Sequence, residues 1–230
     1  MKALFITGTG TGVGKSVVTG CLARYLQEKG QRVATQKWVQ TGSKAGLPLD
    51  IKRHLKFMGK SSCYIKDHLD LVAPYKFKTA CSPHLAARID KRSIRKDKII
   101  KAFKRLSSYF DFVLVEGTGG ILVPFNTKET IADIVRALEL PVLVVAENKL
   151  GAINHTLLTL EALKRRGLRV LGVVFNNLKE KNKKIIDDNP RIVEALSGYE
   201  VLGVLPRTTA GDRLYRRFLP IGDKIWRYLA

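Results

Sequence analysis

The sequence predicts an α/β fold in which a mainly parallel central sheet is covered by helices on both faces. Apolar runs rich in branched residues alternate along the chain with segments of helical periodicity, an order that is typical of such folds. Most of these runs are continuously apolar rather than alternating with polar residues, as in strands buried on both faces. No repeat, low-complexity tract or Pro/Ser-rich linker interrupts the 230 residues, so we expect residues 1–230 to form one domain.

The individual elements follow from the same two patterns. Helices are predicted at Lys15–Lys29, 92–107, His155–Arg166 and 190–197, and the first and third stop before a glycine. Ligands of parallel sheets bind outside the carboxyl ends of the strands, so the residues that follow strands are the candidates for function. The predicted strands are Ala3–Thr7, Arg32–Lys37, Phe112–Glu116, Val142–Ala146, Arg169–Phe175 and Val201–Leu205.

Composition excludes several classes of protein. Three cysteines without a CxxC pair are too few for a disulfide framework or a thiolate zinc site. The N-terminal apolar run, Ala3–Ile6, is too short for a signal-peptide core, and the longest apolar run, Leu140–Ala146, is too short for a membrane span. We therefore expect a cytoplasmic protein without a membrane partner.

The net charge is unusual. Lys and Arg number 41 against 20 Asp and Glu, which gives +21 and raises nucleic acid, an anionic membrane or an anionic substrate as partners. The densest cluster lies in residues 91–105, where the helical spacing spreads it over several faces. We interpret it as a solvated surface, and nucleic acid is not the expected partner.

The first predicted strand leads into a glycine-rich loop, Gly8–Ser16, and a helix follows directly. This is the context of a phosphate-binding P-loop, in which backbone N–H groups and the helix N-terminus bind an anion. Lys15 would reach the β- and γ-phosphates, and the Ser16 hydroxyl would bind Mg²⁺. In the standard pattern the first glycine stands five residues before the glycine that precedes the lysine, a place that Thr9 holds here. The first glycine of this loop is Gly8, so the loop is one residue longer. A P-loop NTPase-like three-layer fold is therefore predicted, and an unliganded glycine-rich turn is the weaker interpretation.

Charged residues end two further strands. Lys37 would face the same crevice as the P-loop, where it could neutralise a phosphoryl group or hold an anionic substrate. Glu116, followed by glycines, has the layout of a second metal-binding segment. Asp50 is a candidate second carboxylate, and an N-cap of the following helix explains it equally well.

The last strands end in weaker signals. The segment Gly151–Asn154 could present free N–H groups to a carboxylate, or Asn154 could simply cap a helix. Asn176 has donors and an acceptor that suit an adenine edge, but asparagine is also a common turn residue.

Taken together and in this order, six segments resemble the dethiobiotin synthetase family. The resemblance runs from the first strand to about Pro206, and its motifs are more specific in combination than singly. The segments are Gly8–Ser16, Lys37 with Thr41–Ser43, Pro74-Tyr75 with Ser82–His84, Val115–Gly120, Lys149–His155 and Asn176-Asn177.

The resemblance implies a homodimeric, MgATP-dependent enzyme that converts 7,8-diaminononanoate and CO2 to dethiobiotin, ADP and phosphate. One amine would form a carbamate, the carbamate would attack the γ-phosphate to give a carbamic–phosphoric anhydride, and the second amine would close the ring. No covalent enzyme intermediate is needed, so catalysis would consist of positioning and charge stabilisation.

By match to the family, Lys15, Lys37 and Thr11 would act on the carbamate and the phosphoryl group, and Ser16, Asp50 and Glu116 would hold Mg²⁺. The substrate would contact Thr41, Lys149, Gly151, Ala152, Ile153 and Asn154, the last four from the neighbouring subunit. The nucleotide would contact Gly12, Val13, Gly14, Lys15, Ser16, Val17, Glu116, Gly119, Asn176 and Pro206.

Three features depart from the family pattern. Gly10 and Gly12 stand where some members have acids, Trp38 replaces the usual proline after the lysine and could shift Lys37, and the charge of +21 is far from the usual balance.

The main alternative is a partitioning-type P-loop ATPase with a basic surface for DNA or membrane. That alternative explains the charge better, but it explains the Lys37–Val39 and Lys149–His155 segments poorly. It also usually carries a second lysine early in the loop, where this chain has Thr9 and Gly10. A cobyrinate synthase would need a second domain with a nucleophilic cysteine, for which 230 residues leave no room.

Overall fold

A six-stranded, wholly parallel sheet forms the centre of the molecule in the computed structural model, which describes residues 2–43, 46–207 and 211–229. The strand order is β2-β5-β1-β6-β7-β8, so β1 lies in the interior with β5 and β6 on either side. The bounds are β1 Lys2–Gly8, β2 Val33–Lys37, β5 Phe112–Glu116, β6 Val142–Glu147, β7 Val170–Asn176 and β8 Val201–Leu205. All six predicted strands are confirmed, with ends that differ by one residue at most.

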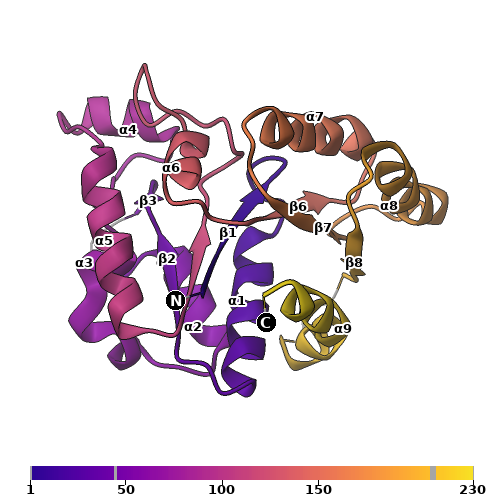
Figure 1. Cartoon of the computed structure of the whole chain (residues 1–230), viewed down its shortest axis with the longest axis horizontal. Helices are drawn as coiled ribbons and strands as arrows, with labels where there is room; N and C mark the ends of the chain where they lie inside the picture. The colour runs from indigo at the N-terminus through magenta and orange to yellow at the C-terminus, as the bar shows by residue number, and fades with distance from the viewer. Residues whose placement is uncertain (1, 44–45, 208–210, 230) are drawn as a thin grey trace.

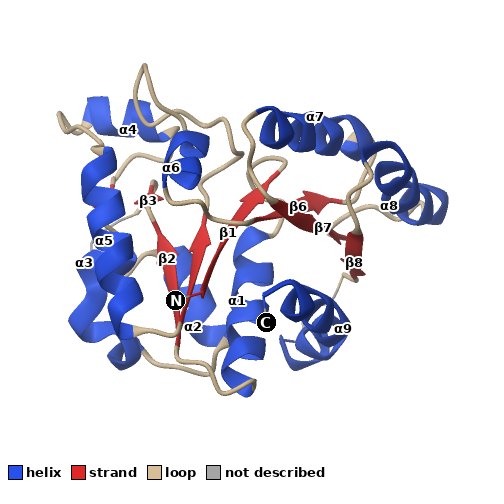
Figure 2. Cartoon of the chain, in the orientation of Figure 1, coloured by secondary structure: helices blue, strands red, loops and turns tan. Residues whose placement is uncertain are grey.

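Helices cover both faces of this sheet, as predicted (Figure 1). In the same view, α1 and α9 lie on one side of the strands and α6 and α7 on the other (Figure 2). The helices are α1 Lys15–Glu28, α2 Leu49–Phe57, α3 Leu69–Val72, α4 Pro83–Ile89, α5 Lys96–Tyr109, α6 Ile131–Ala137, α7 Ala152–Arg165, α8 Lys183–Ser197 and α9 Gly211–Leu229. A 3₁₀ helix, η1, covers Ser62–His68, and a small second sheet pairs β3 (Val39–Gln40) with β4 (Tyr75–Lys76).

The core consists of the strands and the helix faces turned toward them. Leu4, Phe5 and Ile6 of β1 are fully buried, as are Val113 and Leu114 of β5. This burial on both faces explains why the strands read as continuous apolar runs. The rigid sheet fixes the positions of the loops at its carboxyl edge, where the candidate residues lie.

Three of the predicted helix starts are wrong. The helix predicted at 190–197 is the second half of α8, which begins after Asn182, whose side chain accepts a hydrogen bond from the Lys184 N–H. Pro190 lies inside that helix rather than at its start. Helix α5 begins at Lys96, four residues later than expected, and α7 begins at Ala152, three residues earlier.

The two local capping explanations are also wrong. Asp50 lies in the first turn of α2, and Pro48 occupies the N-cap position. Asn154 is the third residue of α7, whose N-cap is Gly151 in a left-handed conformation. In both cases the polar side chain lies inside the first turn and does not cap the helix.

Among the described residues, no helix combines the length and apolar character needed to cross a membrane.

Candidate active site

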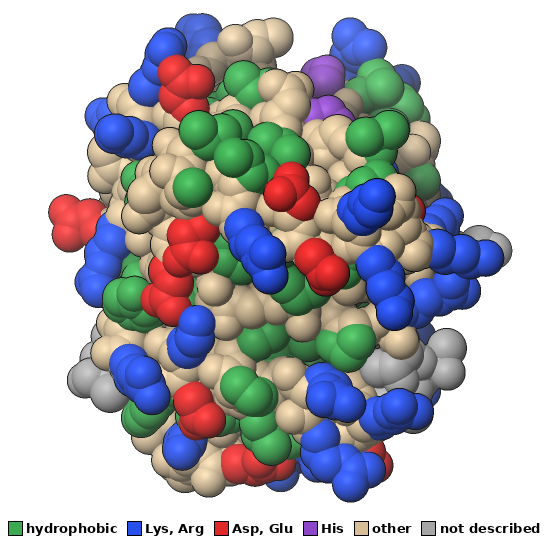
Figure 3. Space-filling model, turned by 90° about the vertical axis from the view of Figure 1, so that its right-hand side faces the viewer, with side chains coloured by type: hydrophobic (Ala, Val, Ile, Leu, Met, Phe, Trp, Pro, Cys, Tyr) green, Lys and Arg blue, Asp and Glu red, His purple; other side chains and the backbone are tan. Residues whose placement is uncertain are grey.

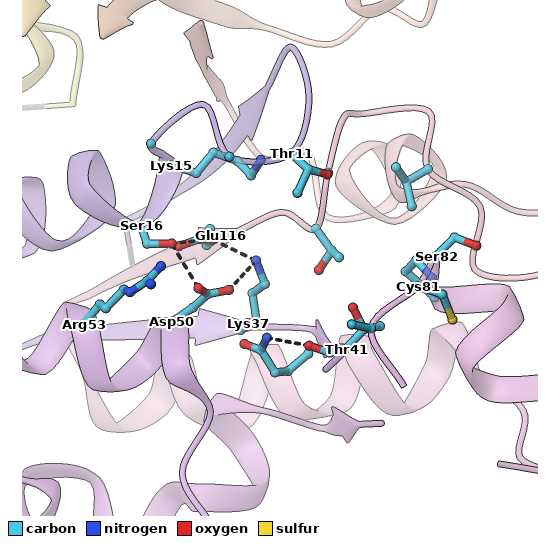
Figure 4. Close-up of a pocket in the computed structure, with 18 of the residues that line it drawn as sticks. Thr11, Lys15, Ser16, Lys37, Thr41, Asp50, Arg53, Cys81, Ser82 and Glu116 are labelled. Carbon is cyan, nitrogen blue, oxygen red and sulfur yellow. Dashed lines mark hydrogen bonds and ion pairs between the residues drawn. The ribbon is translucent and has the colours of Figure 1, made fainter. Parts of the chain in front are cut away.

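A cavity of about 680 Å³ lies at the carboxyl ends of β1, β2 and β5 (Figure 4). Most of the residues predicted for chemistry line it: Thr11, Gly12, Gly14, Lys15, Ser16, Val17, Lys37, Thr41, Asp50, Glu116 and Gly119. Segments that are far apart in the sequence therefore meet at one edge of the sheet, as the strand-end argument predicts.

The P-loop joins β1 to α1 and depends on glycine at two positions. Gly12 and Gly14 have φ values of +80° and +97°, which side chains rarely adopt. A Cβ atom on Gly14 would also lie 1.9 Å from Nδ2 of Asn176, so this position has no room for any other residue. The glycines thus allow the loop to turn sharply into the N-terminus of α1.

Lys15 folds back over the loop. Its Nζ donates to the Gly10 carbonyl oxygen at 2.7 Å, and the residue is almost completely buried. Burial and, secondarily, the nearby ammonium of Lys37 lower the pKa of Lys15 to about 8. A phosphate in the loop would replace the carbonyl as the partner of this cation.

Lys37 is the centre of a buried ionic cluster. Its Nζ lies 2.8 Å from Oε1 of Glu116 and 3.0 Å from Oδ2 of Asp50, and it also donates to the Gly117 carbonyl at 2.8 Å. Burial lowers the pKa of Lys37, but the two carboxylates outweigh it and the net direction is upward. Lys37 therefore stays charged, and it sits beside the space above the P-loop.

Glu116 stays ionised because its neighbours outweigh the effect of burial. Burial raises its pKa, but Lys37 and His54 together hold the pKa of Glu116 well below its usual range. A carboxylate so stabilised remains negative at any physiological pH.

Ser16, Asp50 and Glu116 together fit a magnesium ion. The Ser16 hydroxyl oxygen lies 3.1 Å from Oδ1 of Asp50 and 3.1 Å from Oε1 of Glu116. Oxygen donors from one or two carboxylates and a hydroxyl, completed by water and phosphate oxygens, are the ligand set that Mg²⁺ takes in nucleotide sites. In the described part of the chain, no group of three or more His, Cys, Asp or Glu side chains could hold a metal by itself.

Trp38 leaves the position of Lys37 undisturbed. Its indole is 2% exposed, packs on Phe5 with ring centroids 5.0 Å apart, and donates its Nε1–H to the Gln36 side chain. The bulk of the indole lies in the core rather than in the cavity, so Lys37 reaches both carboxylates.

The residues of the segment Lys149–Asn154 that were predicted to contact the substrate do not line this cavity. Gly151 and Ile153 line a separate hollow of about 540 Å³ between the start of α7 and α8. Lys149 forms an ion pair of 2.8 Å with Glu147, and Ala152 is buried at the start of α7. Within one chain, the structure does not bring these residues to Lys15 and Lys37.

Asn176 and Pro206 also occupy distinct places. Asn176 is buried beneath the P-loop, where its Nδ2 donates to the carbonyl oxygen of Val13 at 3.2 Å. Pro206 follows β8 and lines a hollow of about 590 Å³ beside α9. Asn176 thus contacts the P-loop directly, and the hollow at Pro206 lies beyond it along the sheet edge.

Several residues at the site escaped the sequence argument. Arg53, Gln40, Cys81 and Thr118 line the cavity, and His54 is fully buried with Nε2 2.6 Å from Oε2 of Glu116. His54 stands four residues after Asp50, a spacing that puts both on one face of a helix, so a signal was available. Thr118 and Gln40 carried no comparable signal because they lie in irregular or very short elements.

Comparison with known proteins assigns the chain to a family. A family model described as an AAA domain matches residues 2–213. The ATP-dependent dethiobiotin synthetase BioD of Thermodesulfovibrio yellowstonii is 38% identical over 220 residues, covering 91% of this chain and 90% of that protein. The chain belongs to the dethiobiotin synthetase family. A second member, BioD 2 of Haemophilus influenzae, is 41% identical over 179 residues, covering 78% of this chain and 93% of that protein.

Solved structures with the same fold are more distant from this dethiobiotin synthetase family member. The cell division ATPase MinD of Pyrococcus furiosus has a TM-score of 0.58 at 18% identity, covering 99% of this chain and 100% of that one. A ParA family ATPase of Chlorobium tepidum has a TM-score of 0.55 at 13% identity, covering 96% and 91%. These matches confirm the P-loop NTPase-like fold and show the fold alone.

Proposed function

We propose that this chain synthesises dethiobiotin from 7,8-diaminononanoate, CO2 and ATP, with ADP and phosphate as the other products. One observation carries the proposal: a buried lysine, Lys37, is held between two carboxylates beside a P-loop, in a chain 38% identical to a named dethiobiotin synthetase. The P-loop alone would support any nucleotide-dependent reaction. Lys37 adds a second fixed cation at the place where a phosphoryl group would be transferred.

The chemistry needs positioning more than covalent catalysis. One substrate amine adds to CO2 and loses a proton to give a carbamate, whose oxygen attacks the γ-phosphorus while ADP leaves. The second amine then attacks the carbonyl carbon of the resulting anhydride and loses a proton, phosphate departs and the ring closes. Lys15, Lys37 and Thr11 would hold the carbamate and the phosphoryl oxygens in line, and the two ammonium groups would stabilise their negative charge.

Magnesium would be held by Ser16, Asp50 and Glu116, which form a compact set of oxygen donors. When bound, the ion neutralises charge on the β- and γ-phosphates. Lys37 already contacts both carboxylates, so the same two acids would orient the catalytic cation and the metal.

The substrate site involves a second subunit in this proposal. Thr41 lines the cavity, but Gly151 and Ile153 line another hollow of the same chain. Nearby Leu150 is 80% exposed and Leu158 is 55% exposed, and a partner subunit would cover these two apolar side chains. A homodimer would let the first turn of α7 in one subunit bind the substrate carboxylate at the cavity of the other.

The adenine end of ATP is assigned to Asn176 and Pro206. Asn176 contacts the P-loop, and Pro206 lies at the end of the neighbouring strand β8. This arrangement supports a nucleotide that runs from Lys15 across Asn176 toward Pro206.

The partitioning-type ATPase lacks comparable support. Its structural relatives share the fold at 13–18% identity, whereas the relatives near 40% identity are named dethiobiotin synthetases. The charge of +21 favours an anionic partner only in a general way, and on the face displayed in Figure 3 the basic side chains are interspersed with acidic and apolar ones.

The test is phosphate release from MgATP and bicarbonate, measured with and without 7,8-diaminononanoate, with the product identified by mass. Release that depends on the diamine, together with formation of dethiobiotin, is the expected result. ATP hydrolysis whose rate is independent of the diamine but is raised by DNA or lipid would refute the proposal in favour of the ATPase alternative.

A further inference from the structure

His54 is a fully buried histidine whose imidazole has one hydrogen-bond partner among the described residues. Its Nε2 lies 2.6 Å from Oε2 of Glu116, and its Nδ1 is buried without a partner among the described residues. An ionised carboxylate only accepts hydrogen bonds, so Nε2 carries the proton and donates it to Glu116.

The unpaired Nδ1 argues against a purely structural role. A buried polar atom without a partner destabilises the fold, and an apolar residue of similar volume on α2 would avoid that cost. Since the one hydrogen bond of His54 goes to Glu116, the function of His54 should be found in that carboxylate.

The two carboxylate oxygens of Glu116 have different partners. Oε2 accepts from His54, and Oε1 faces the cavity, where Lys37 lies at 2.8 Å and the Ser16 hydroxyl at 3.1 Å. The imidazole thus sets the plane of the carboxylate and keeps Oε1 directed at Ser16. Without that hydrogen bond, the carboxylate would be free to rotate toward Lys37 with both oxygens.

Helix α2 presents two groups to this cluster at once. Asp50 and His54 are four residues apart and therefore lie one above the other on the same face of the helix. Asp50 reaches Lys37 and Ser16, and His54 reaches the far oxygen of Glu116. The position of α2 against α1 and β2 consequently fixes both carboxylates relative to the P-loop.

We propose that His54 is a positioning residue that orients Glu116 for the magnesium ion of the bound nucleotide. The proposal rests on the MgATP-dependent function proposed above. Outer hydrogen bonds to ligating groups generally matter for the metal more than for the fold, and their loss lowers metal affinity about 10–100-fold.

The experiment compares His54→Leu, which removes the donor and keeps an apolar volume, with His54→Gln, which keeps an N–H donor near the position of Nε2. Ile51→Val is the matched control, since it trims a buried side chain on the same helix and leaves the hydrogen bond from His54 to Glu116 in place. The readout is the affinity for a non-hydrolysable ATP analogue, measured by calorimetry in Mg²⁺ and again in EDTA, together with the Mg²⁺ concentration that gives half-maximal turnover.

For His54→Leu, we expect the ratio of the affinities in Mg²⁺ and EDTA to fall about 10–100-fold, with the affinity in EDTA unchanged. His54→Gln should restore most of the ratio, and Ile51→Val should match the wild type. If His54→Leu melts at a lower temperature but keeps the wild-type ratio and the wild-type Mg²⁺ requirement, the role is structural and the proposal is wrong.

Two further outcomes keep the test decisive. If His54→Leu does not fold, His54→Asn replaces it, because its shorter amide does not reach Glu116; equal ratios for the Asn and Gln variants would overturn the proposal. If the wild type shows no diamine-dependent phosphate release, the proposed function fails. The affinity ratios would still report on whether His54 positions the metal ligand.

Discussion

The carboxyl ends of β1, β2 and β5 differ sharply from those of β6, β7 and β8, although both sets belong to one parallel sheet. In the first set, Ser16, Lys37 and Glu116 converge on one cavity and contact one another. In the second, Ile153 and Pro206 line two separate hollows. The residues proposed for phosphoryl transfer therefore meet within one chain, whereas the residues proposed to bind the substrate carboxylate lie apart from them.

The largest effect is expected from breaking the half of the site proposed for phosphoryl transfer. Lys37→Ala should lower turnover about 1,000-fold or more while leaving ATP affinity nearly unchanged, because in the proposed function Lys37 stabilises the transferring group rather than the resting nucleotide. Steady-state kinetics and calorimetry with the ATP analogue measure the two quantities separately.

Loss of Lys37 also leaves two carboxylates without their buried cation, which destabilises the fold. Lys37→Met, which keeps most of the side-chain volume, should show the same kinetic defect, and Lys52→Ala on the exposed face of α2 should show none. Near-normal turnover in both Lys37 variants would refute the catalytic role of this lysine.

The second prediction addresses the half proposed to bind the substrate carboxylate. Asn154→Asp adds a negative charge in the first turn of α7, where the helix dipole favours it, so the variant should fold at least as stably as the wild type. The same charge should repel the substrate carboxylate and raise the KM for the diamine about 10-fold or more, with ATP affinity unchanged. Asn154→Gln, which adds no charge, is the control.

Mixing the two variants tests whether the halves come from different subunits. In a mixed dimer of Lys37→Ala and Asn154→Asp chains, one of the two sites would receive both of its wild-type residues. After random exchange of subunits, activity at low diamine should rise to roughly a quarter of the wild type. An activity equal to the average of the separate variants would show that each site is built from one chain.

The same contrast separates what sequence reasoning predicted from what it missed. Lys37 and Glu116 end buried strands and Lys15 closes the loop after β1, and the geometry of a parallel sheet brings strand ends together whatever the loops between them do. Asp50 and His54 are different, because their approach to Glu116 and Lys37 depends on α2 docking against α1. Asp50 was predicted by the family match, and the four-residue spacing places His54 on the same helix face, but neither pattern predicts that long-range packing. The start of α8 was missed because Pro190 reads as a helix start although the packing accommodates it inside the helix.

A third, smaller effect concerns the protonation of Lys15, whose pKa is lowered to about 8 in the free protein. Phosphate in the loop would raise that pKa again, so nucleotide binding should take up as much as one proton at about pH 9 and should weaken as the pH rises above about 8. Calorimetry in buffers with different ionisation enthalpies measures this uptake.

Lys15→Ala is the control for the proton uptake, and persistence of the uptake in that variant would assign it to another group. The sign for stability is the opposite of that for binding. The folded-state pKa of Lys15 lies below its unfolded value of 10.5, so the unfolded chain binds more protons between these limits. The contribution of Lys15 to stability therefore becomes less unfavourable as the pH rises through this window.

The smallest effect is expected from the basic surface, which lies outside both halves of the site. On α5, Lys98, Lys101 and Arg105 share a hollow with Asp70 and Asp97, so a polyanion would meet acids as well as bases there. Duplex DNA should accordingly bind only in the non-specific range, with a dissociation constant of about 10⁻⁴–10⁻⁶ M at physiological salt and a steep loss of affinity as salt increases. It should not compete with ATP, because the hollow on α5 and the cavity beside the P-loop share no lining residue. Fluorescence anisotropy over a salt series, with and without ATP, measures the affinity, its salt dependence and the competition. Tight, sequence-selective binding at physiological salt would mean that the charge serves a nucleic-acid partner.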